Sequence, residues 1–496
     1  MRTSGILMPI FSLASKGGIG TLGKEAYRFV DFLEKSEQTW WQILPLNPTN
    51  YGDSPYQSFS SYAGNPYFID PEMLVEEGLL YRPEFESFDF GNNPQKIDYG
   101  KLYQNRKKML KLAFARFKED KEYKDFCKQN DFWLYDYALF MAIKNANADV
   151  SWEEWDEPLR FRETEAIEKA KKVYKKDIAF YCFVQYLFSK QWQALKKYAN
   201  KKGIKIIGDI PIYVAYDSAD VWSDTQQFWL DKNLKPKAVA GCPPDAFCDD
   251  GQLWGNPLYD WKFMKADGFN WWKRRMKYVL SLYDCVRIDH FRGFESYYSV
   301  PYGDKTAING KWVKGPDIAL FKALETELGK DLPIIAEDLG FLTPAVLKML
   351  KKSGYPGMKV LQFAFDVEKE SEYLPHNFIN NSVVYTGTHD NDTIIGWAKN
   401  SPEEEVAFAE EYLGAKRDNG FNWAMMKTAL RSVADTCILM MQDLIGLDSE
   451  GRINIPSTVG DNWTWRIDGG CINDWLAKII AENTKVYGRA QKKDLE

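Results

Sequence analysis

The distribution of hydrophobic residues along the chain shows eight short apolar segments, separated by stretches with a helical or irregular pattern. The segments are residues 5–13, 40–46, 204–214, the start of 285–294, 333–336, 359–365, 382–387 and 437–442. Short runs that are apolar throughout are typical of strands buried on both faces. Between them, apolar residues recur at helical spacing, as at Ala26, Phe29, Val30 and Leu33. This alternation predicts an α/β fold, a (β/α)8 TIM barrel of parallel strands.

A doubly wound open sheet is the main competing architecture for this pattern. That fold carries a G-x-G-x-x-G phosphate loop after its first strand and an acidic residue at the end of its second. Residues 15–23, SKGGIGTLG, contain glycines without that spacing, and no acidic residue ends the second strand. A solvated turn explains these glycines more simply, so we favour the barrel.

Two long segments interrupt the alternation, and we interpret them as insertions into a single catalytic barrel that spans residues 1–496. Residues from about 66 to 200 are dominated by Lys-rich helical patterns and predict a mostly helical insertion after the second strand. Residues from about 215 to 275 predict an irregular or helical insertion after the third strand. Within it, residues 240–261 show neither a helical nor a strand period. A loop of that length in a compact protein is usually functional.

The composition excludes several classes of protein. Of the 496 residues, 45% are hydrophobic and 27% are charged, with a net charge of −6 and no Lys/Arg-rich stripe, so we expect no nucleic-acid partner. No apolar run approaches the ~18 residues of a membrane span. The start of the chain lacks the apolar core and cleavage site of a signal peptide. The seven cysteines form no C-x-x-C pair, which favours reduced thiols in the cytoplasm over a zinc site.

Acidic residues follow three of the predicted strands. Asp289 follows the fourth strand, Glu337 the fifth and Asp390 the seventh, and two of the chain's three histidines, His290 and His389, adjoin them. In a parallel barrel the carboxyl ends of the strands meet at one face, where the chemistry takes place. Aromatic residues make up 15% of the chain, and flat rings of this kind suit a sugar-binding cleft. We therefore expect an active site built from these acids.

Cleavage of a glycosidic bond requires one ionised and one protonated carboxyl group. Arg287 shares a strand face with Asp289 and would keep it ionised. Glu337 follows the apolar residues 333–336 and adjoins Asp338, and both features favour its protonated form. Asp289 is thus the candidate nucleophile and Glu337 the candidate acid/base. Asp390, with His389, would bind sugar hydroxyls and support an oxocarbenium-like transition state.

Structural roles and a different chemistry compete with this interpretation. Arg287 and Asp289 also fit a purely structural ion pair, Glu337 a solvated loop position and Asp390 a turn-forming position. Asp209 fits a turn-stabilising role as well as a substrate contact, and packing is the simplest role for Trp254. A divalent metal held by several acids is the other chemistry, but a fixed guanidinium at Arg287 would repel it. We expect no metal.

Several motifs of this chain together resemble a known family. They are GDIPIYV (208–214), RIDHFRG (287–293), IIAEDLG (334–340) and THDND (388–392), with further matches at 45–66, 251–261 (GQLWGNPLYDW) and 460–466 (GDNWTWR). They occur in the order found in the 4-α-glucanotransferases called amylomaltases or disproportionating enzymes. That family is glycoside hydrolase family 77 of the α-amylase superfamily. The resemblance covers nearly the whole chain.

The resemblance implies a barrel with inserted helical subdomains and transfer of an α-1,4-glucan segment to an acceptor, with retention through a glycosyl-enzyme intermediate. It assigns Asp289 as nucleophile, Glu337 as acid/base and Asp390 as transition-state stabiliser. It implies sugar-binding roles for a further set of residues, which are Arg287, His389, Asp209, Tyr56, Gln252, Trp254 and, as secondary polar positions, Asp338 and His290. No cofactor is expected. Where the family pattern has Gly directly before Asn-Trp, this chain has Asp461.

The implied partners are malto-oligosaccharides as donors and glucose or a glucan as acceptor, and the oligomeric state stays open. An α-1,4-glucan hydrolase of the α-amylase type is the alternative function. It differs from a transferase in how well loops such as 50–65 and 245–258 exclude water. A catalytically silent glucan-binding protein is a second alternative, but it would lack one of the three acids, and all three are present.

Overall fold

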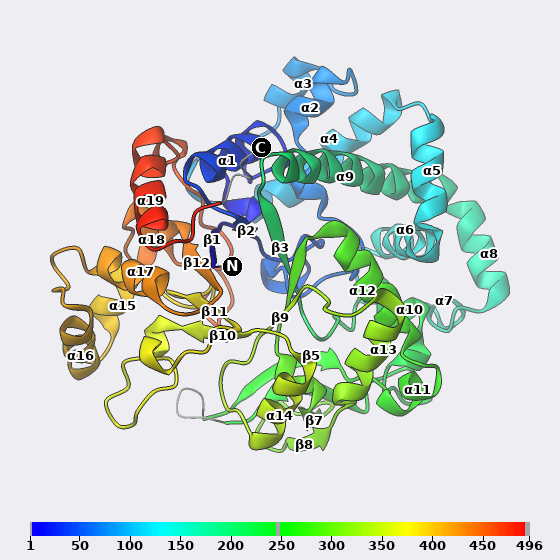
Figure 1. Ribbon diagram of the computed structural model, residues 1–496. Helices are drawn as coiled ribbons and strands as arrows, with labels where there is room; N and C mark the ends of the chain where they lie inside the picture. Colours follow the sequence, from blue (N-terminus) through cyan, green and yellow to red (C-terminus); the bar gives the residue numbers. More distant parts are fainter. Residues whose placement is uncertain (1, 245–248, 492–496) are drawn as a thin grey trace.

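The computed structural model describes residues 2–244 and 249–491, and its centre is a sheet of eight parallel strands (Figure 1). In spatial order these are β10 (Gly357–Val360), β11 (Ser382–Tyr385), β12 (Thr436–Met440), β1 (Thr3–Leu7), β2 (Trp40–Gln42), β3 (Lys205–Ile210), β6 (Cys285–Ile288) and β9 (Ile334–Ala336). The two edge strands meet where the Ala336 N–H donates to the Pro356 carbonyl at 3.0 Å. The predicted (β/α)8 barrel is confirmed.

Several strands are shorter than the apolar runs that predict them. The run 5–13 contains only the end of β1, because the chain turns at Pro9 into a 3-10 helix, Ile10–Ser12. The run 359–365 contains the end of β10 followed by a second 3-10 helix, Leu361–Phe363. These turns are largely buried beside the barrel. The predicted strand ends are therefore wrong, since burial continues past the strand and keeps the sequence apolar.

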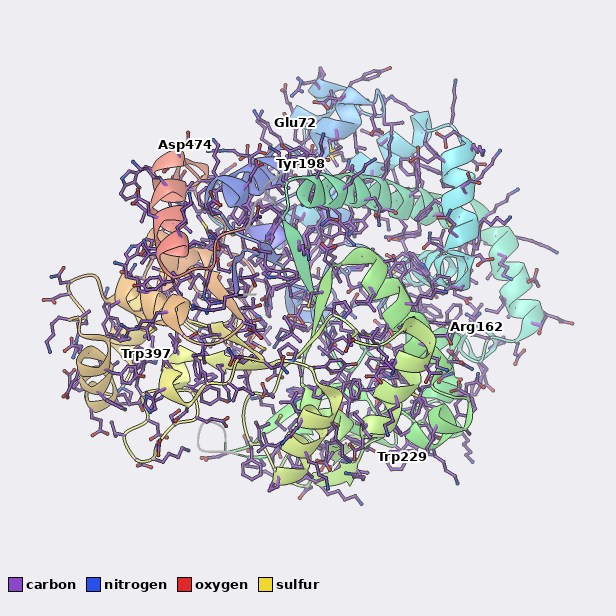
Figure 2. All side chains as sticks on the ribbon, in the orientation of Figure 1. Glu72, Arg162, Tyr198, Trp229, Trp397 and Asp474 are labelled. Atoms are coloured by element: carbon purple, nitrogen blue, oxygen red, sulfur yellow. The ribbon has the colours of Figure 1, made fainter. Side chains whose placement is uncertain are left out.

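Helices cover the outside of the barrel, and side chains fill the space between the two layers (Figure 2). They include α1 (Lys24–Lys35), α12 (Asn270–Leu282), α13 (Ile318–Leu328), α14 (Pro344–Ser353), α15 (Ile394–Asn400), α16 (Glu403–Leu413), α17 (Phe421–Arg431) and α19 (Asp474–Val486). The four residues of α1 predicted to face inward are all buried. In the described segment between β10 and β11 the only helices are two 3-10 turns.

Eight α-helices lie between β2 and β3. They are α2 (Pro71–Glu76), α3 (Arg82–Glu86), α4 (Tyr99–Arg116), α5 (Lys121–Gln129), α6 (Asp131–Ala146), α7 (Glu157–Arg160), α8 (Thr164–Val173) and α9 (Lys175–Lys201). Figure 1 shows them as one mass on one side of the barrel, with the long helix α9 leading back to β3. None of the helices in the described residues is both long and apolar enough to cross a membrane.

A second sheet is formed by the segments that follow β3 and β6 in the chain. Its presence shows that one prediction was wrong. Its antiparallel order is β5 (Gln252–Pro257), β4 (Ala238–Cys242), β7 (Ser296–Pro301) and β8 (Lys311–Lys314). Residues 240–261 were predicted to have no strand period, yet they contain β5 and the end of β4. The pairing between these strands is irregular near Val239 and Gly241, and Gly255 has a left-handed φ of 76°. Such irregularities hide a period of two in the sequence.

Candidate active site

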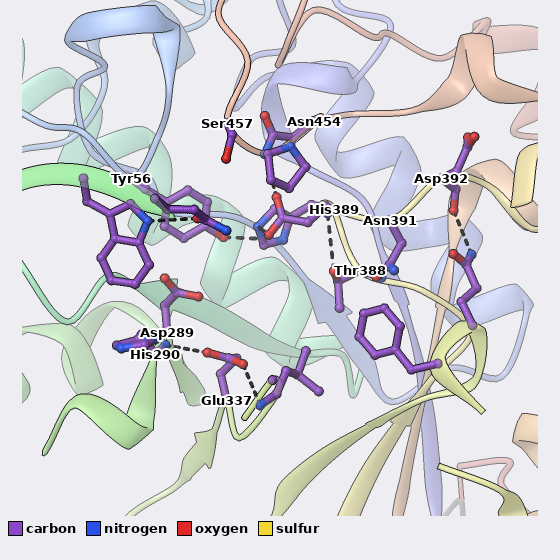
Figure 3. Close-up of a pocket in the computed structure, with 18 of the residues that line it drawn as sticks. Tyr56, Asp289, His290, Glu337, Thr388, His389, Asn391, Asp392, Asn454 and Ser457 are labelled. Atoms are coloured by element: carbon purple, nitrogen blue, oxygen red, sulfur yellow. Dashed lines mark hydrogen bonds and ion pairs between the residues drawn. The ribbon is translucent and has the colours of Figure 1, made fainter. Parts of the chain in front are cut away.

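The carboxyl ends of the barrel strands open into one large cleft of about 1790 Å³. All three predicted acids line it. Of the predicted binding residues, those that line it are Arg287, His389, His290, Tyr56, Gln252 and Trp254. Figure 3 shows Asp289 and Glu337 on one wall of the cleft, and Tyr56 with His389 on the opposite side.

Arg287 forms the floor of the cleft and joins two carboxylates. Its Nη1 donates to Asp209 at 2.7 and 3.0 Å, and its Nη2 donates to Asp289 Oδ1 at 2.8 Å. Its side chain is 4% exposed. Burial alone lowers an arginine pKa, but Asp209 and Asp289 outweigh it and raise the pKa of Arg287 well above its usual range. Asp289 is thus held in an ion pair, with one oxygen fixed and its side chain one-third exposed to the cleft.

Glu337 follows β9, the strand beside β6, and its environment favours the protonated form. Its Oε2 accepts from the His290 N–H at 2.6 Å and its Oε1 from the Leu339 N–H at 2.8 Å. Burial, followed by the charge of Asp289, raises the pKa of Glu337 to about 8, against the lowering effect of Arg287 and these two N–H groups. The two neighbouring strand ends therefore present a carboxylate in an ion pair with Arg287 and a carboxyl group whose raised pKa favours its protonated form.

The backbone at His290 brings its N–H group to Glu337. His290 has a left-handed conformation, with φ 52° and ψ 47°, which is uncommon for a residue with a side chain. Its ring meets Trp254 edge to face, with centroids 4.8 Å apart, and the Trp254 indole donates to Gln252 Oε1 at 3.0 Å. Burial lowers the pKa of His290 to about 4, so its ring is neutral at pH 7.

On the other side of the cleft, Tyr56 and His389 stack with ring centroids 5.1 Å apart. The Tyr56 hydroxyl donates to Asp209 Oδ2 at 2.9 Å, which links this side to the Arg287 floor. Burial lowers the pKa of His389, with Asp390 opposing the shift, so the imidazole is neutral near pH 7. The Trp463 ring lies 5.9 Å from both rings. An aromatic surface from three distant segments therefore faces the two carboxyl groups.

Asp390 is hydrogen-bonded by two residues that were not predicted from the sequence. Its Oδ1 accepts from Asn454 Nδ2 at 2.6 Å, and its backbone carbonyl accepts from Arg452 Nη2 at 2.8 Å. The Asn454 N–H in turn donates to the His389 carbonyl at 3.1 Å. Both residues line the cleft. The Arg452–Asn454 segment thus fixes the orientation of the third acid.

The loop that carries Trp463 is closed by Asn462. The Asn462 Oδ1 accepts from the Ile455 N–H at 3.0 Å, and its Nδ2 donates to the Thr458 carbonyl at 3.1 Å. Asp461 and Trp463 on either side have positive φ angles of 56° and 63°. Glycine adopts such a conformation most easily, which accounts for glycine at the position of Asp461 in the pattern that the sequence resembles.

Two predicted binding residues do not line the cleft. Asp209 is fully buried beneath it and reaches it only through Arg287 and Tyr56. Asp338 lies on the far side of the chain from Glu337, is 5% exposed, and its Oδ1 accepts from the Met358 N–H at 2.6 Å. Its carboxyl group therefore secures β10 rather than facing the cleft. Both positions indicate a supporting role in place of the predicted direct contact with substrate.

A metal centre finds no support in the cleft. Across residues 2–244 and 249–491, no group of three or more His, Cys, Asp or Glu side chains is arranged to hold a metal ion. Arg287 also forms ion pairs with both Asp209 and Asp289, and its positive charge would repel a metal ion from these carboxylates. The cleft instead combines an anionic carboxylate, a protonated carboxyl group and aromatic rings, as cleavage of a glycosidic bond requires.

Comparisons with known proteins agree with this geometry. The 4-alpha-glucanotransferase family model matches residues 8–472. A 4-alpha-glucanotransferase of Clostridium butyricum is 50% identical over 488 residues, which cover 98% of this chain and 100% of the relative. That of Thermus thermophilus is 45% identical over 479 residues, covering 94% and 95%. A solved amylomaltase from Streptococcus agalactiae, in complex with acarbose, is 41% identical with a TM-score of 0.96, covering 99% of this chain and 100% of that one. This chain belongs to the 4-alpha-glucanotransferase family.

Proposed function

We propose that the protein transfers a segment of an α-1,4-glucan from a malto-oligosaccharide donor to the 4-hydroxyl of an acceptor glucose or glucan. The observation that carries the proposal is the pair formed by Asp289, in an ion pair with Arg287, and Glu337, whose pKa is raised to about 8. They follow the neighbouring strands β6 and β9. A nucleophile and an acid at this place can cleave a glycosidic bond with retention.

In the first step, Glu337 donates its proton to the glycosidic oxygen while Asp289 attacks the anomeric carbon. The C–O bond to the leaving sugar breaks and a glycosyl ester on Asp289 forms. Because Oδ1 of Asp289 accepts a hydrogen bond from Arg287, Oδ2 is the oxygen that attacks the anomeric carbon. In the second step, Glu337 accepts the proton of the acceptor 4-hydroxyl, the acceptor oxygen bonds to the anomeric carbon, and the ester to Asp289 breaks.

The remaining residues bind and orient the sugar. Asp390, with His389, hydrogen-bonds hydroxyls of the ring at the reacting carbon as positive charge develops there. Tyr56 stacks on the apolar face of that ring. Trp254, Gln252 and His290 bind on the side of the leaving group and the acceptor. Asp209 and Asp338 act indirectly, by holding Arg287, Tyr56 and β10 in place.

Incubation with maltotriose tests transfer against hydrolysis. We expect a ladder of longer chains together with glucose, at a constant number of reducing ends, because each bond broken is replaced by one formed. An increase in reducing ends without longer products would assign the protein to the α-1,4-glucan hydrolases, the second candidate. No change in either quantity would contradict both.

We also propose that residues 1–496 form one catalytic unit, with insertions at about 66–200 and 215–275. The loop that precedes the first segment and the strand β5 of the second both line the cleft, through Tyr56 and Trp254 respectively. A cytoplasmic location is supported by free thiols at Cys127, Cys182, Cys285, Cys437 and Cys471. Cys248 lies outside the described residues, as do the other residues of 245–248.

Removal of metal ions should leave activity intact. The proposed steps use only carboxyl groups of the protein, so the rate of maltotriose disproportionation is expected to be unchanged after treatment with EDTA. A loss of activity that a divalent ion restores would revive the metal-dependent alternative.

Replacing Asn454 by Ala should lower kcat by roughly ten- to a hundredfold, since a hydrogen bond to a charged group contributes about 1.5–3 kcal/mol. The variant removes the 2.6 Å donor to Asp390 Oδ1, so the effect should appear in kcat more than in KM. An Asn454→Gln variant, which keeps an amide, should recover part of the loss. As a control we choose Asn381→Ala, which removes an amide bonded to the Gly354 carbonyl outside the cleft and should retain wild-type kcat.

A further inference from the structure

The segment that carries His389 and Asp390, residues 386–394, leads from the end of β11 to the first residue of α15. Between these two elements the chain forms neither helix nor strand. Residues 388–392 line the cleft (Figure 3). The placement of two proposed sugar-binding side chains therefore depends on the contacts that hold an irregular segment.

Hydrogen bonds within the segment determine the shape of its middle. The Asn391 Oδ1 accepts from the Thr388 N–H at 2.8 Å and from the Thr388 hydroxyl at 2.9 Å. The Asp390 N–H donates to Thr388 Oγ1 at 3.3 Å. These bonds form a closed local turn, as Asn and Thr side chains often do. The position of this turn on the barrel depends on contacts with other segments.

One buried carboxyl group contacts both ends of the segment. Asp443 belongs to α18 (Met441–Ile445), which follows β12 directly. Its Oδ2 accepts from the Thr386 hydroxyl at 2.8 Å, and its Oδ1 accepts from the Ile394 N–H at 2.8 Å. Ile394 opens α15, where backbone N–H groups have no partner within the helix. A single side chain thus joins the end of β11 to the start of α15.

Asp443 is a buried acid without a cation beside it. It is 1% exposed, and within residues 2–244 and 249–491 it forms no ion pair. Burial raises the pKa of Asp443 to about 7, against the lowering effect of its two hydrogen bonds. Burying a carboxyl group in this way costs free energy that an apolar side chain of similar size would not. Packing alone therefore does not explain an acid at this position, whereas its two hydrogen bonds do.

We propose that Asp443 is a positioning residue for the transfer reaction. By holding both ends of the 386–394 segment, it places His389 and Asp390 against the sugar ring at the reacting carbon. The inference rests on the proposed function, in which Asp390 supports the transition state. Asn454 holds the carboxyl group of Asp390 from within the cleft, whereas Asp443 fixes the backbone on both sides of it. A misplacement of about 1 Å can cost about a hundredfold in rate.

Kinetics of the full chain with maltotriose test this role. Asp443→Leu keeps a side chain of similar size but removes both hydrogen bonds, so it should lower kcat by roughly ten- to a hundredfold with little change in KM. Asp443→Asn should recover most of the loss, since its amide can accept from the Ile394 N–H and donate to the Thr386 hydroxyl. Wild-type kcat in Asp443→Leu, or equal losses in the two variants, would overturn the proposal.

Asp70→Leu is the matched control. Asp70 is also buried, and its carboxyl group likewise accepts from one threonine hydroxyl and one backbone N–H, those of Thr21 at 2.5 Å and Met73 at 3.0 Å. None of these three residues lines the cleft, so Asp70→Leu should lower the melting temperature but retain kcat. If Asp443→Leu fails to fold, Thr386→Val takes its place, because it removes one hydroxyl and keeps the shape. It should lower kcat severalfold, and wild-type kcat there would contradict the proposal.

A double-mutant cycle separates this inference from the proposed function. Asp390→Asn alone should lower kcat on the order of a hundredfold, as loss of a group that supports the transition state. In that background Asp443→Leu should cost less than about threefold more, because most of its effect passes through Asp390. Fully additive losses would assign Asp443 a structural role and overturn the inference alone. Wild-type kcat in Asp390→Asn would contradict the proposed function, and with it this inference.

Discussion

Asp289→Asn is expected to lower kcat for maltotriose disproportionation on the order of 10⁴-fold or more. The substitution preserves the shape of the side chain but removes the negative charge, and an amide oxygen is too weak a nucleophile to form the glycosyl ester. Arg287 keeps its hydrogen bonds to Asp209, so the floor of the cleft should remain in place. The measurement is the initial rate of glucose release together with the distribution of product lengths.

The matched control lies at the opposite end of the same strand. Asp284 precedes β6, and its Oδ2 accepts from the Ile206 N–H at 2.8 Å, a bond that the amide oxygen of Asn can also accept. Asp284→Asn should therefore retain kcat, with at most a small fall in melting temperature. Activity of Asp289→Asn within tenfold of wild type would rule out this residue as the nucleophile.

The sequence was sufficient to predict the barrel because its strands are buried on both faces. Such strands appear as continuous apolar runs, and three of them are followed by acidic residues at the same end of the barrel. What the pattern could not define was where a strand ends, since Ile10 and Leu361 remain buried after the chain has turned. The antiparallel strands β4 and β5 were missed for a different reason. Their glycines and irregular pairing conceal the alternation that identifies a half-buried strand.

The candidate site was predictable where each residue adjoins a strand end. Asp289, Glu337 and Asp390 lie within two residues of the strand end or in the turn that follows it, so topology alone brings them together. Alternation along an extended chain also explains why Asp338 points away, because consecutive side chains leave on opposite sides. Asn454 could not be predicted in this way. It lies in an irregular segment near the end of the chain, and only the fold brings it to Asp390.

Glu337→Gln is expected to lower kcat for maltotriose by about 10³-fold, within the range that general acid–base catalysis contributes. The leaving sugar needs a proton, and the amide cannot supply one. A donor whose leaving group needs no proton, such as an α-maltosyl fluoride, should restore the first step. Glycosyl-enzyme would then accumulate, because no base remains to activate the acceptor. Mass spectrometry of the intact protein should detect this adduct.

The raised pKa of Glu337 also determines the pH dependence. The group must be protonated for the first step, so the rate with maltotriose should fall as the pH rises through about 8. This descending limb should be absent in Glu337→Gln with the fluoride donor. The stability of the folded protein should also fall as the pH rises over this range. The folded state holds the proton more tightly than the unfolded state, so this contribution is complete below the ordinary glutamate pKa and is lost as the pH rises through about 8.

Urea unfolding at a series of pH values separates this effect from catalysis. Between about pH 5 and pH 8, wild type should lose stability relative to Glu337→Gln, whose side chain does not titrate. Glu295→Gln is the matched control, because Glu295 is also buried but does not line the cleft, and its rate should keep the descending limb near pH 8. If Glu337→Gln retained that limb, or showed no gain from the fluoride donor, another group would have to be the acid. The position of Glu337, between two backbone N–H groups and beside Asp289, would then be structural.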